Sequence, residues 1–375
     1  MPRFLAIGFS FALLLVVGCA GGDATSPQPT PTRSATLRPT RTPVPTRTPP
    51  PTATPPPNPL FVRLSGNDTN TGADPGHALR TISRAAQVAL GGDTIVVGPG
   101  TYREGVTVGG GGAVRALLLI ADPSGTRTGD AAGRVSIDAT GAPEKAGFKM
   151  SGSPGTVIDG FVVSGGTDGG IVVKSGSDNA TIRNCTVFSN AGDGIRLQDS
   201  ANVLVFNNLM YGNGGTGIGV VGQISGAPHA TVVNNTIAGN GGRGITVGNT
   251  QAASPGAFVR NNIVQGNLGD ANIKVFTPPP AGVPRSDVGY SEDFDLVFPP
   301  FFLPPTLAGL HDIGADALFV NSGAGDFHLR LTSPAIDAGD PLSSLPALAG
   351  LLRLRTTTGA AADSGPLDLG FHYAP

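Results

Sequence analysis

Two short segments in the middle of the chain carry basic side chains with carboxylates nearby. Alternation along residues 171–174 (Ile-Val-Val-Lys) and 195–198 (Ile-Arg-Leu-Gln) would bury one face of each strand and turn the other outward. The outward residues would be Val172, Lys174, Arg196 and Gln198. An outward Lys can act as a base, and an Arg can neutralise a carboxylate on a bound molecule.

Four aspartates lie near the ends of these two strands: Asp168, Asp178, Asp193 and Asp199. Carboxylates are hard oxygen ligands, so Asp168, Asp193 and Asp199 are candidates for holding a metal ion. Asp193 is also a catalytic candidate together with Lys174 and Arg196. The alternative is ordinary surface chemistry, because Asp supports the turn in which it sits and surface strands carry scattered charges.

These strands belong to a run of repeats between residues 157 and 275. Five segments align, and their third positions are Asp159, Asn184, Asn207, Asn234 and Asn261. The steps between these positions are 25, 23, 27 and 27 residues. A second asparagine series follows six residues later at 190, 213, 240 and 267. A period in the twenties indicates a solenoid.

The composition of the repeats selects one kind of solenoid. Leucine-rich repeats need Leu at fixed places and helical repeats need helix formers, whereas here Gly and Asn interrupt short β-branched runs. Such runs are typical of strands joined by tight turns, which predicts an all-β, parallel β-helix. A structural Asn ladder is expected at Asn184, Asn207, Asn234 and Asn261. Asn tolerates the left-handed backbone of a turn, and its amide can bond to the same amide one coil away.

Composition and charge agree with this fold and exclude one class of partner. Charged residues make up 13% of the 375, against about 25% in ordinary globular proteins. The first 59 residues hold five Arg and one Asp, so the rest has 19 basic and 25 acidic residues, a net of −6. A nucleic-acid binder should carry a basic face, which argues against that function. We expect the chain to act as a monomer.

The amino terminus reads as an export signal. A short basic start and an apolar run end in Val-Val-Gly-Cys, which resembles the lipobox of bacterial lipoproteins. Residues 1–22 are therefore predicted to be a lipoprotein signal peptide, with Cys19 as the lipidated residue. The alternative is an ordinary signal peptide cut near Ala20. If Cys19 is lipidated, the protein is exported, lipid-anchored to a bacterial membrane and displayed outside the cell.

The remaining chain divides into a linker and one folded domain. Residues 23–59 are rich in Thr and Pro, which predicts a disordered, semi-rigid spacer. Residues 60–375 are predicted to form a single domain, with an N-terminal cap and first strands at 60–104, coils at 105–275, and irregular coils and a cap at 276–375. Helical spacing of apolar residues over 78–90 predicts a short capping helix.

The N-terminal part of this domain resembles secreted right-handed parallel β-helix proteins of the pectin-lyase-like superfamily, which includes family 9 pectate lyases. The matching motifs are Ser-Gly-Asn-Asp at 65–68, Leu-Arg-Thr-Ile at 79–82, Gly-Asp-Thr-Ile-Val-Val at 92–97 and Gly-Pro-Gly-Thr-Tyr-Arg-Glu at 98–104. The C-terminal part is similar to the choice-of-anchor Q group of surface β-helix proteins. Its motifs are Asp-Ala-Leu-Phe-Val at 316–320, Gly-Asp-Phe-His-Leu at 325–329, Ser-Pro-Ala-Ile-Asp-Ala-Gly at 333–339 and Asp-Leu-Gly at 368–370.

The resemblance implies a right-handed β-helix and, for a lyase, β-elimination on a uronide by a Lys base with Ca²⁺ held by several Asp. No tight Asp cluster in this sequence matches that calcium site residue by residue. We therefore expect a surface-anchored protein that binds extracellular or cell-surface polysaccharide. A polysaccharide lyase or hydrolase acting on an acidic glycan, with Ca²⁺ as its cofactor, is the first alternative. A structural surface spacer is the second.

Overall fold

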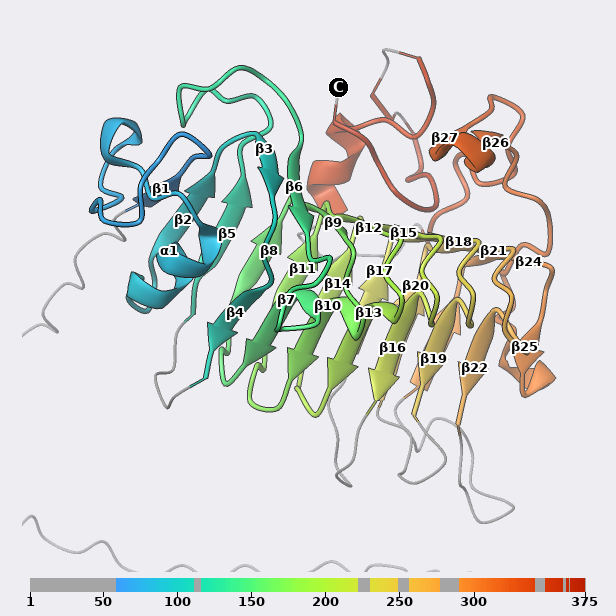
Figure 1. The fold of residues 1–375 in the computed structure, drawn as a ribbon. Helices are drawn as coiled ribbons and strands as arrows, with labels where there is room; N and C mark the ends of the chain where they lie inside the picture. The colour runs from blue at the N-terminus through green and yellow to red at the C-terminus, as the bar shows by residue number, and fades with distance from the viewer. Residues whose placement is uncertain are drawn as a thin grey trace, which may run out of the picture. The chain divides into compact units, whose positions relative to one another are not determined.

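The computed structural model describes residues 59–110, 116–221, 230–248, 256–276, 290–340, 348–359, 362–363 and 365–374. All of them lie in one compact unit, Thr54–Pro375. No helix among these residues has the length and hydropathy needed to cross a bilayer. Figure 1 shows the fold, in which successive coils stack side by side.

Strands β1 to β25 form three parallel sheets, here called A, B and C, which the chain visits in that order in each coil from β2 on. Sheet A contains β1 Pro59–Val62, β2 Thr94–Val97, β5 Leu118–Ala121, β8 Val157–Asp159, β11 Thr181–Arg183, β14 Leu204–Phe206, β17 Ala230–Val233, β20 Ala257–Arg260 and β23 Tyr290–Asp293. Sheet B contains β3 Gly100–Tyr102, β6 Val135–Asp138, β9 Val162–Ser164, β12 Thr186–Phe188, β15 Leu209–Tyr211, β18 Thr236–Ala238, β21 Ile263–Gln265 and β24 Leu296–Phe298.

Sheet C contains β4 Val106–Gly109, β7 Ala146–Ser151, β10 Gly169–Lys174, β13 Asp193–Gln198, β16 Ile218–Val221, β19 Ile245–Val247, β22 Ile273–Val275 and β25 Phe302–Leu303. An antiparallel pair follows, β26 Phe319–Asn321 and β27 Asp326–Leu329. The described helices are α1 Ile82–Val88 and the 3₁₀ turns η1 Pro75–His77, η3 Pro305–Leu307, η4 Ser322–Ala324 and η5 Leu348–Arg353.

Matching positions in successive coils stack into columns inside the solenoid. In sheet A, Ile182, Val205, Val232 and Val259 pair in register and have no exposed surface. Each such side chain contributes roughly 1.5–3 kcal/mol by leaving water. The predicted parallel β-helix with β-branched inward residues is therefore confirmed.

The N-terminal helix is present but shorter than predicted. The expected range was 78–90, whereas α1 spans Ile82–Val88. Leu79 is drawn into an extended conformation, because its N–H donates to the Phe61 carbonyl and its own carbonyl accepts from Arg63 N. The helix starts only after Thr81, whose side chain accepts from Arg84 N.

The predicted Asn column lies at the turn between sheets A and B. Asn184, Asn207, Asn234 and Asn261 all have φ between 52° and 58°, the left-handed region that Asn tolerates. Asn184 Nδ2 donates to Asp159 Oδ1 at 2.7 Å, and Asn207 Nδ2 donates to Asn184 Oδ1 at 2.8 Å. Asn261 Nδ2 donates to Asn234 Oδ1 at 3.3 Å.

A second ladder, one residue further along each coil, is wholly buried and points inward. It contains Cys185, Asn208, Asn235, Asn262 and Asp295. Asn235 Oδ1 accepts from Asn208 N at 2.9 Å and from Asn208 Nδ2 at 3.0 Å. Asn262 Oδ1 accepts the same pair of bonds from Asn235, both at 3.0 Å. This inner ladder satisfies backbone groups that the turn would otherwise leave unpaired inside the solenoid.

The C-terminal region folds back over sheets A and B. Phe319, Phe327 and Leu369 form a buried cluster with Leu209 and Ile263 of sheet B. Leu351 packs on Phe206 and Val233 of sheet A. Two backbone N–H groups anchor the end of the chain: His372 N donates to the side-chain oxygen Asn207 Oδ1 at 2.6 Å, and Gly370 N donates to Asn261 O at 2.9 Å. The two hydrophobic clusters that this region forms with the coils therefore lie on sheets A and B.

Cys185 gives a simple test of the buried ladder. Its thiol is fully buried, and this burial raises its pKa to about 12. Because the thiolate is the reactive form, we expect no alkylation of Cys185 in the folded protein at neutral pH and complete alkylation after unfolding. Mass spectrometry after iodoacetamide treatment measures this. Rapid labelling without denaturant would contradict the ladder's position inside the solenoid.

Candidate functional site

The outer face of sheet C carries a row of residues in register. Lys149 of β7 pairs with Val172 of β10, and Val172 pairs with Arg196 of β13. The row continues through Gly219 and Thr246 to Lys274 of β22. Parallel strands stack about 4.8 Å apart, so Lys149 and Arg196 lie on strands about 10 Å apart. Basic residues therefore recur along the axis of the solenoid.

Arg196 organises the carboxylates beside this row. Its Nη2 lies 2.7 Å from Asp168 Oδ2, and its Nη1 lies 3.9 Å from Asp193 Oδ2. Asp193 Oδ1 also accepts from Thr216 N at 2.8 Å. The structure thus brings together three of the predicted residues, Asp168, Asp193 and Arg196, and the guanidinium is already engaged by two carboxylates.

Two lysines complete the group that we call the sheet C patch: Lys149, Lys174, Arg196, Asp168 and Asp193. Lys174 ends β10 and Lys149 lies in the middle of β7. Both are partly exposed, and neither makes a salt bridge or hydrogen bond to a described residue. Their charges act at longer range on Asp168. These ammonium groups are free to meet an anionic ligand.

The two carboxyls of the sheet C patch differ in their environment. The hydrogen bond from Arg196 lowers the pKa of Asp168, with smaller contributions from Lys174 and Lys149. Burial raises the pKa of Asp193, and the hydrogen bond from Thr216 N and the longer contact with Arg196 offset only part of this. Asp168 is therefore the stronger partner of Arg196.

Val172 points outward as predicted, but it is covered by its neighbours. Val172 belongs to the outer row but has no exposed surface. It lies between Lys149 and Arg196 in register, and a Cβ built on Gly169 would lie 3.2 Å from its Cγ2. Long side chains with apolar stems commonly cover such a residue. Val172 thus forms the apolar floor between two cations.

The predicted metal ligands do not form one set. Asp168 and Asp193 face Arg196, whereas Asp199 follows Gln198 at the opposite end of β13. Six residues of strand separate Asp193 from Asp199, about 20 Å. Among the described residues, groups of three acidic side chains with closely spaced oxygens occur elsewhere. Asp168, Asp193 and Asp199 therefore do not fit a Ca²⁺ ion, and we derive no step through one.

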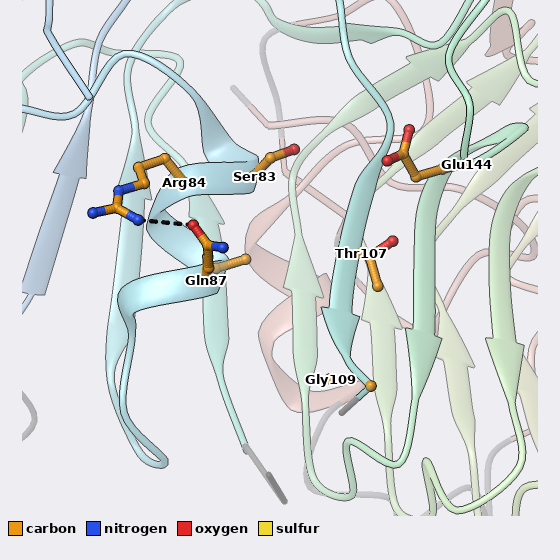
Figure 2. A pocket seen from close by; sticks show the side chains of 8 residues that line it. Ser83, Arg84, Gln87, Thr107, Gly109 and Glu144 are labelled. Atoms are coloured by element: carbon orange, nitrogen blue, oxygen red, sulfur yellow. Dashed lines mark hydrogen bonds between the residues drawn. The ribbon is translucent and has the colours of Figure 1, made fainter. Parts of the chain in front are cut away.

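A cavity of about 430 Å³ borders the same face at its N-terminal end (Figure 2). Thr107 and Gly109 of β4 form one wall, and Arg84 and Gln87 of α1 form the other. Thr107 pairs with Lys149, so the cavity continues the outer row of sheet C. Figure 2 shows Glu144 on the far side of β4 from α1, with its carboxylate free of bonds to the residues drawn.

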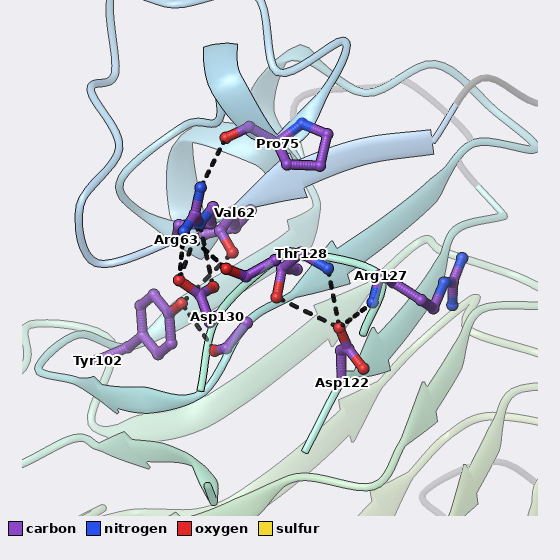
Figure 3. Close-up of polar contacts among 10 residues, drawn as sticks. Val62, Arg63, Pro75, Tyr102, Asp122, Arg127, Thr128 and Asp130 are labelled. Atoms are coloured by element: carbon purple, nitrogen blue, oxygen red, sulfur yellow. Dashed lines mark hydrogen bonds and ion pairs between the residues drawn. The ribbon is translucent and has the colours of Figure 1, made fainter. Parts of the chain in front are cut away.

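Two sets of contacts hold the N-terminal cap that carries α1. The Glu104 carboxylate accepts from Ile82 N and Ser83 N, both at 2.9 Å, which caps the start of the helix. On the preceding segment, Arg63 binds Asp130 through Nη2 at 2.6 Å and through Nε at 2.9 Å (Figure 3). The wall of the cavity is thereby fixed to the first coils.

A second charged group lies further along sheet C. Asp270 Oδ2 accepts from Lys274 Nζ at 2.6 Å, and Asp270 also pairs closely with Arg243. Phe276 lies 4.7 Å from Lys274 Nζ and 5.4 Å from the Arg243 guanidinium, measured to the ring centre. Lys274 and Arg243 therefore each contact the Asp270 carboxylate and the face of the Phe276 ring.

Lys149 was not among the predicted site residues, although the sequence contains a signal for it. Gly147-Phe-Lys-Met aligns with Gly170-Ile-Val-Val and Gly194-Ile-Arg-Leu, which places Lys149 at the outward position held by Arg196. Cys19, the predicted lipidation site, lies outside the described residues.

Comparison with known proteins bears on the fold. A family model for the right handed beta helix region matches residues 143–274. The chain is a right-handed parallel β-helix. The match spans most of the coils from β7 to β22 and includes every residue of the sheet C patch.

A search of curated proteins finds no match for this β-helix. Among solved structures it is similar to the crystal structure of pectate lyase Pel9A, with 16% sequence identity and a TM-score of 0.49. The similarity covers 83% of this chain and 96% of that chain. The predicted likeness to choice-of-anchor Q proteins and the lipid anchor stay predictions.

Proposed function

We propose that the protein binds an acidic polysaccharide along the outer face of sheet C. The observation that carries this proposal is the pair of unengaged lysines, Lys149 and Lys174, beside Arg196 on neighbouring coils. Together with the sequence of residues 1–59, the proposal describes an exported protein that is anchored through Cys19 and holds its β-helix away from the membrane.

The charge of the sheet C patch favours an anionic ligand. It contains three cations and two carboxylates, although residues 60–375 carry a net charge of −6. On an acidic protein, a local positive region attracts anions, whereas the negatively charged remainder of the surface repels them. Carboxylate or sulfate groups on a glycan would accept charge-assisted hydrogen bonds from Lys149 and Lys174.

The geometry favours a linear polymer over a small molecule. The basic positions Lys149, Arg196 and Lys274 lie in one row across the strands, parallel to the axis of the solenoid. Successive strands are about 4.8 Å apart, so an extended chain along the axis would meet these cations at intervals of about 10 and 14 Å. A ligand that extends along the axis could therefore meet more of these cations than a compact one.

A lyase is the alternative with a specific observation behind it, because Lys174 and Arg196 lie on the same face. A base and a carboxylate-neutralising Arg are the groups that β-elimination needs. Arg196, however, is held by Asp168 at 2.7 Å, and its Nε is buried without a hydrogen-bond partner among the described residues. The ion pair with Asp168 makes this guanidinium less available to neutralise a substrate carboxylate, whereas Lys149 and Lys174 make no ion pair with a described residue, which supports binding over catalysis.

One experiment separates these functions. Purified protein is passed over immobilised uronate, sulfated and neutral polysaccharides, and soluble glycans are incubated in parallel with and without Ca²⁺. We expect retention on acidic glycans only, elution by salt, and no ultraviolet absorbance from unsaturated uronate. A rise in that absorbance would identify a lyase instead. Passage through every acidic column would contradict the binding proposal and favour a structural spacer.

A further inference from the structure

The last described coil breaks two columns that are neutral in the preceding coils. In sheet A, the inward column of Ile182, Val205, Val232 and Val259 ends at Glu292. In the inner ladder, Asn208, Asn235 and Asn262 are followed by Asp295. Two carboxylates therefore enter the interior from one coil, where earlier coils place Val and Asn.

A third carboxylate extends the ladder by one more step. Asp295 Oδ1 accepts from Asn262 N at 2.6 Å and from Asn262 Nδ2 at 2.9 Å, as the Asn oxygens do in earlier coils. Asp312 Oδ1 in turn accepts from Asp295 N at 3.0 Å, and Asp312 Oδ2 accepts from Gly309 N at 2.6 Å. Asp312 is thus held in place beside the end of the ladder.

The three carboxyl groups converge, and three of their buried oxygens have no hydrogen-bond donor among the described residues. Glu292, Asp295 and Asp312 each place an oxygen within 4.8 Å of the other two. Asp295 has no exposed surface, and its Oδ2 accepts no hydrogen bond from a described residue. Both Glu292 carboxylate oxygens are also buried and receive no hydrogen bond from the part of the chain that the structure describes. Buried, unpaired carboxylates are costly, so something must neutralise them.

No described cation makes a salt bridge to this cluster. Arg260 is the nearest candidate, but it pairs in register with Asp293 on the outward side of β23. Its Nη1 lies 3.8 Å from Asp293 Oδ2 and 3.4 Å from Asp340 Oδ2. The arginine therefore offsets the charge of the cluster only from a distance.

The pattern of the ladder shows what surrounds Asp295 Oδ2. Asn262 Nδ2 donates to two backbone carbonyls, Val232 O at 3.0 Å and Arg260 O at 2.9 Å, and Asn235 makes the same pair of bonds one coil earlier. Asp295 keeps the oxygen of the ladder amide but has a second oxygen in place of the NH₂ group. An acceptor thus occupies the place from which the equivalent amides donate to carbonyls.

We propose that Glu292, Asp295 and Asp312 bind one hard divalent cation, with Ca²⁺ the best fit, which closes the C-terminal end of the β-helix interior. Ca²⁺ takes six to eight oxygen ligands at about 2.3–2.6 Å, so ligands on opposite sides of one ion are about 4.8 Å apart. Three carboxylates supply the charge, and backbone carbonyls or water complete the shell. The ion would act structurally, by binding the folded state alone.

The test compares thermal unfolding of the chelator-treated protein with and without added CaCl₂. For the wild type we expect the unfolding midpoint to rise with Ca²⁺ concentration and to rise less with MgCl₂. Titration calorimetry should show one Ca²⁺ site, with an affinity that accounts for the rise in midpoint. Asp295→Asn restores the amide of the ladder, so the variant should fold. It should lose the Ca²⁺ response and, without Ca²⁺, should be more stable than the wild type.

A matched control comes from the other close group of acidic residues, Asp337, Asp363 and Asp368. Asp337→Asn changes the same charge outside the proposed site and should keep the full Ca²⁺ response. If Asp295→Asn also keeps it, the ion binds elsewhere and the proposal is wrong. If neither cation shifts the wild-type midpoint, shared protons neutralise the carboxyls and the proposal is equally wrong.

Discussion

A variant carrying Lys149→Glu and Lys174→Glu should bind acidic polysaccharide on the order of 100-fold more weakly than the wild type. Each lysine is expected to donate a charge-assisted bond of about 1.5–3 kcal/mol, and 1.4 kcal/mol corresponds to a tenfold change in affinity. Reversal also adds repulsion between the patch and the glycan. Neither lysine makes an ion pair with a described residue, so the fold should tolerate both changes. Affinity chromatography with a salt gradient measures the loss.

The control for this variant changes the same number of charges away from sheet C. Arg127 and Arg330 are exposed, and Arg127→Glu with Arg330→Glu lowers the net charge equally. We expect nearly unchanged retention, since exposed charges more than about 10 Å from a bound ligand are largely screened at 0.1 M salt. Equal losses in the two double variants would show that net charge, rather than the sheet C patch, determines binding.

Asn235→Ala should lower the free energy of unfolding by roughly 3–5 kcal/mol. The Asn235 amide donates to Val205 O, Val233 O and Asn262 Oδ1, each at 3.0 Å, and its Oδ1 accepts from Asn208. Alanine would leave several of these buried groups without a partner, and each unsatisfied group costs about 1–3 kcal/mol. Chemical denaturation followed by circular dichroism measures the change.

Asn321→Ala is the matched control for the ladder variant. Asn321 ends β26, is exposed, and makes no side-chain capping bond. Surface substitutions of this kind usually change stability by less than about 0.5 kcal/mol. If the two alanine variants unfolded at the same denaturant concentration, the inner ladder would not be a major source of stability.

The fold was predictable because its determinants repeat along the sequence. Asn184 and its equivalents return every 23–27 residues at a turn that needs a left-handed residue, so one pattern reports both the period and the turn. The short helix was also predictable, although its start was not. Leu79 fits a helical pattern equally well, and only the backbone bonds to Phe61 and Arg63 place it in an extended segment.

Only those residues of the candidate site that lie in regularly repeating coils could be predicted from the sequence. Arg196 and Lys174 lie in coils with the regular repeat, whereas Lys149 lies one coil before the aligned segments. Asp199 is close to Asp193 in the sequence, but the extended strand β13 lies between them and places them at its opposite ends. The cluster of Glu292, Asp295 and Asp312 joins the last coil to a later segment, and a pattern read coil by coil cannot show such a contact.

The return of the C-terminal segment onto the middle coils has a consequence for synthesis. Asn207 and the residue that bonds to it, His372, are 165 positions apart. At about 5–20 residues per second, roughly 8–33 s pass between translation of the two. During that interval the apolar outer faces of sheets A and B, including Phe206 and Val233, lack the segment that covers them. Premature termination would leave the same faces open permanently, so truncated chains should aggregate even though their coils can stack.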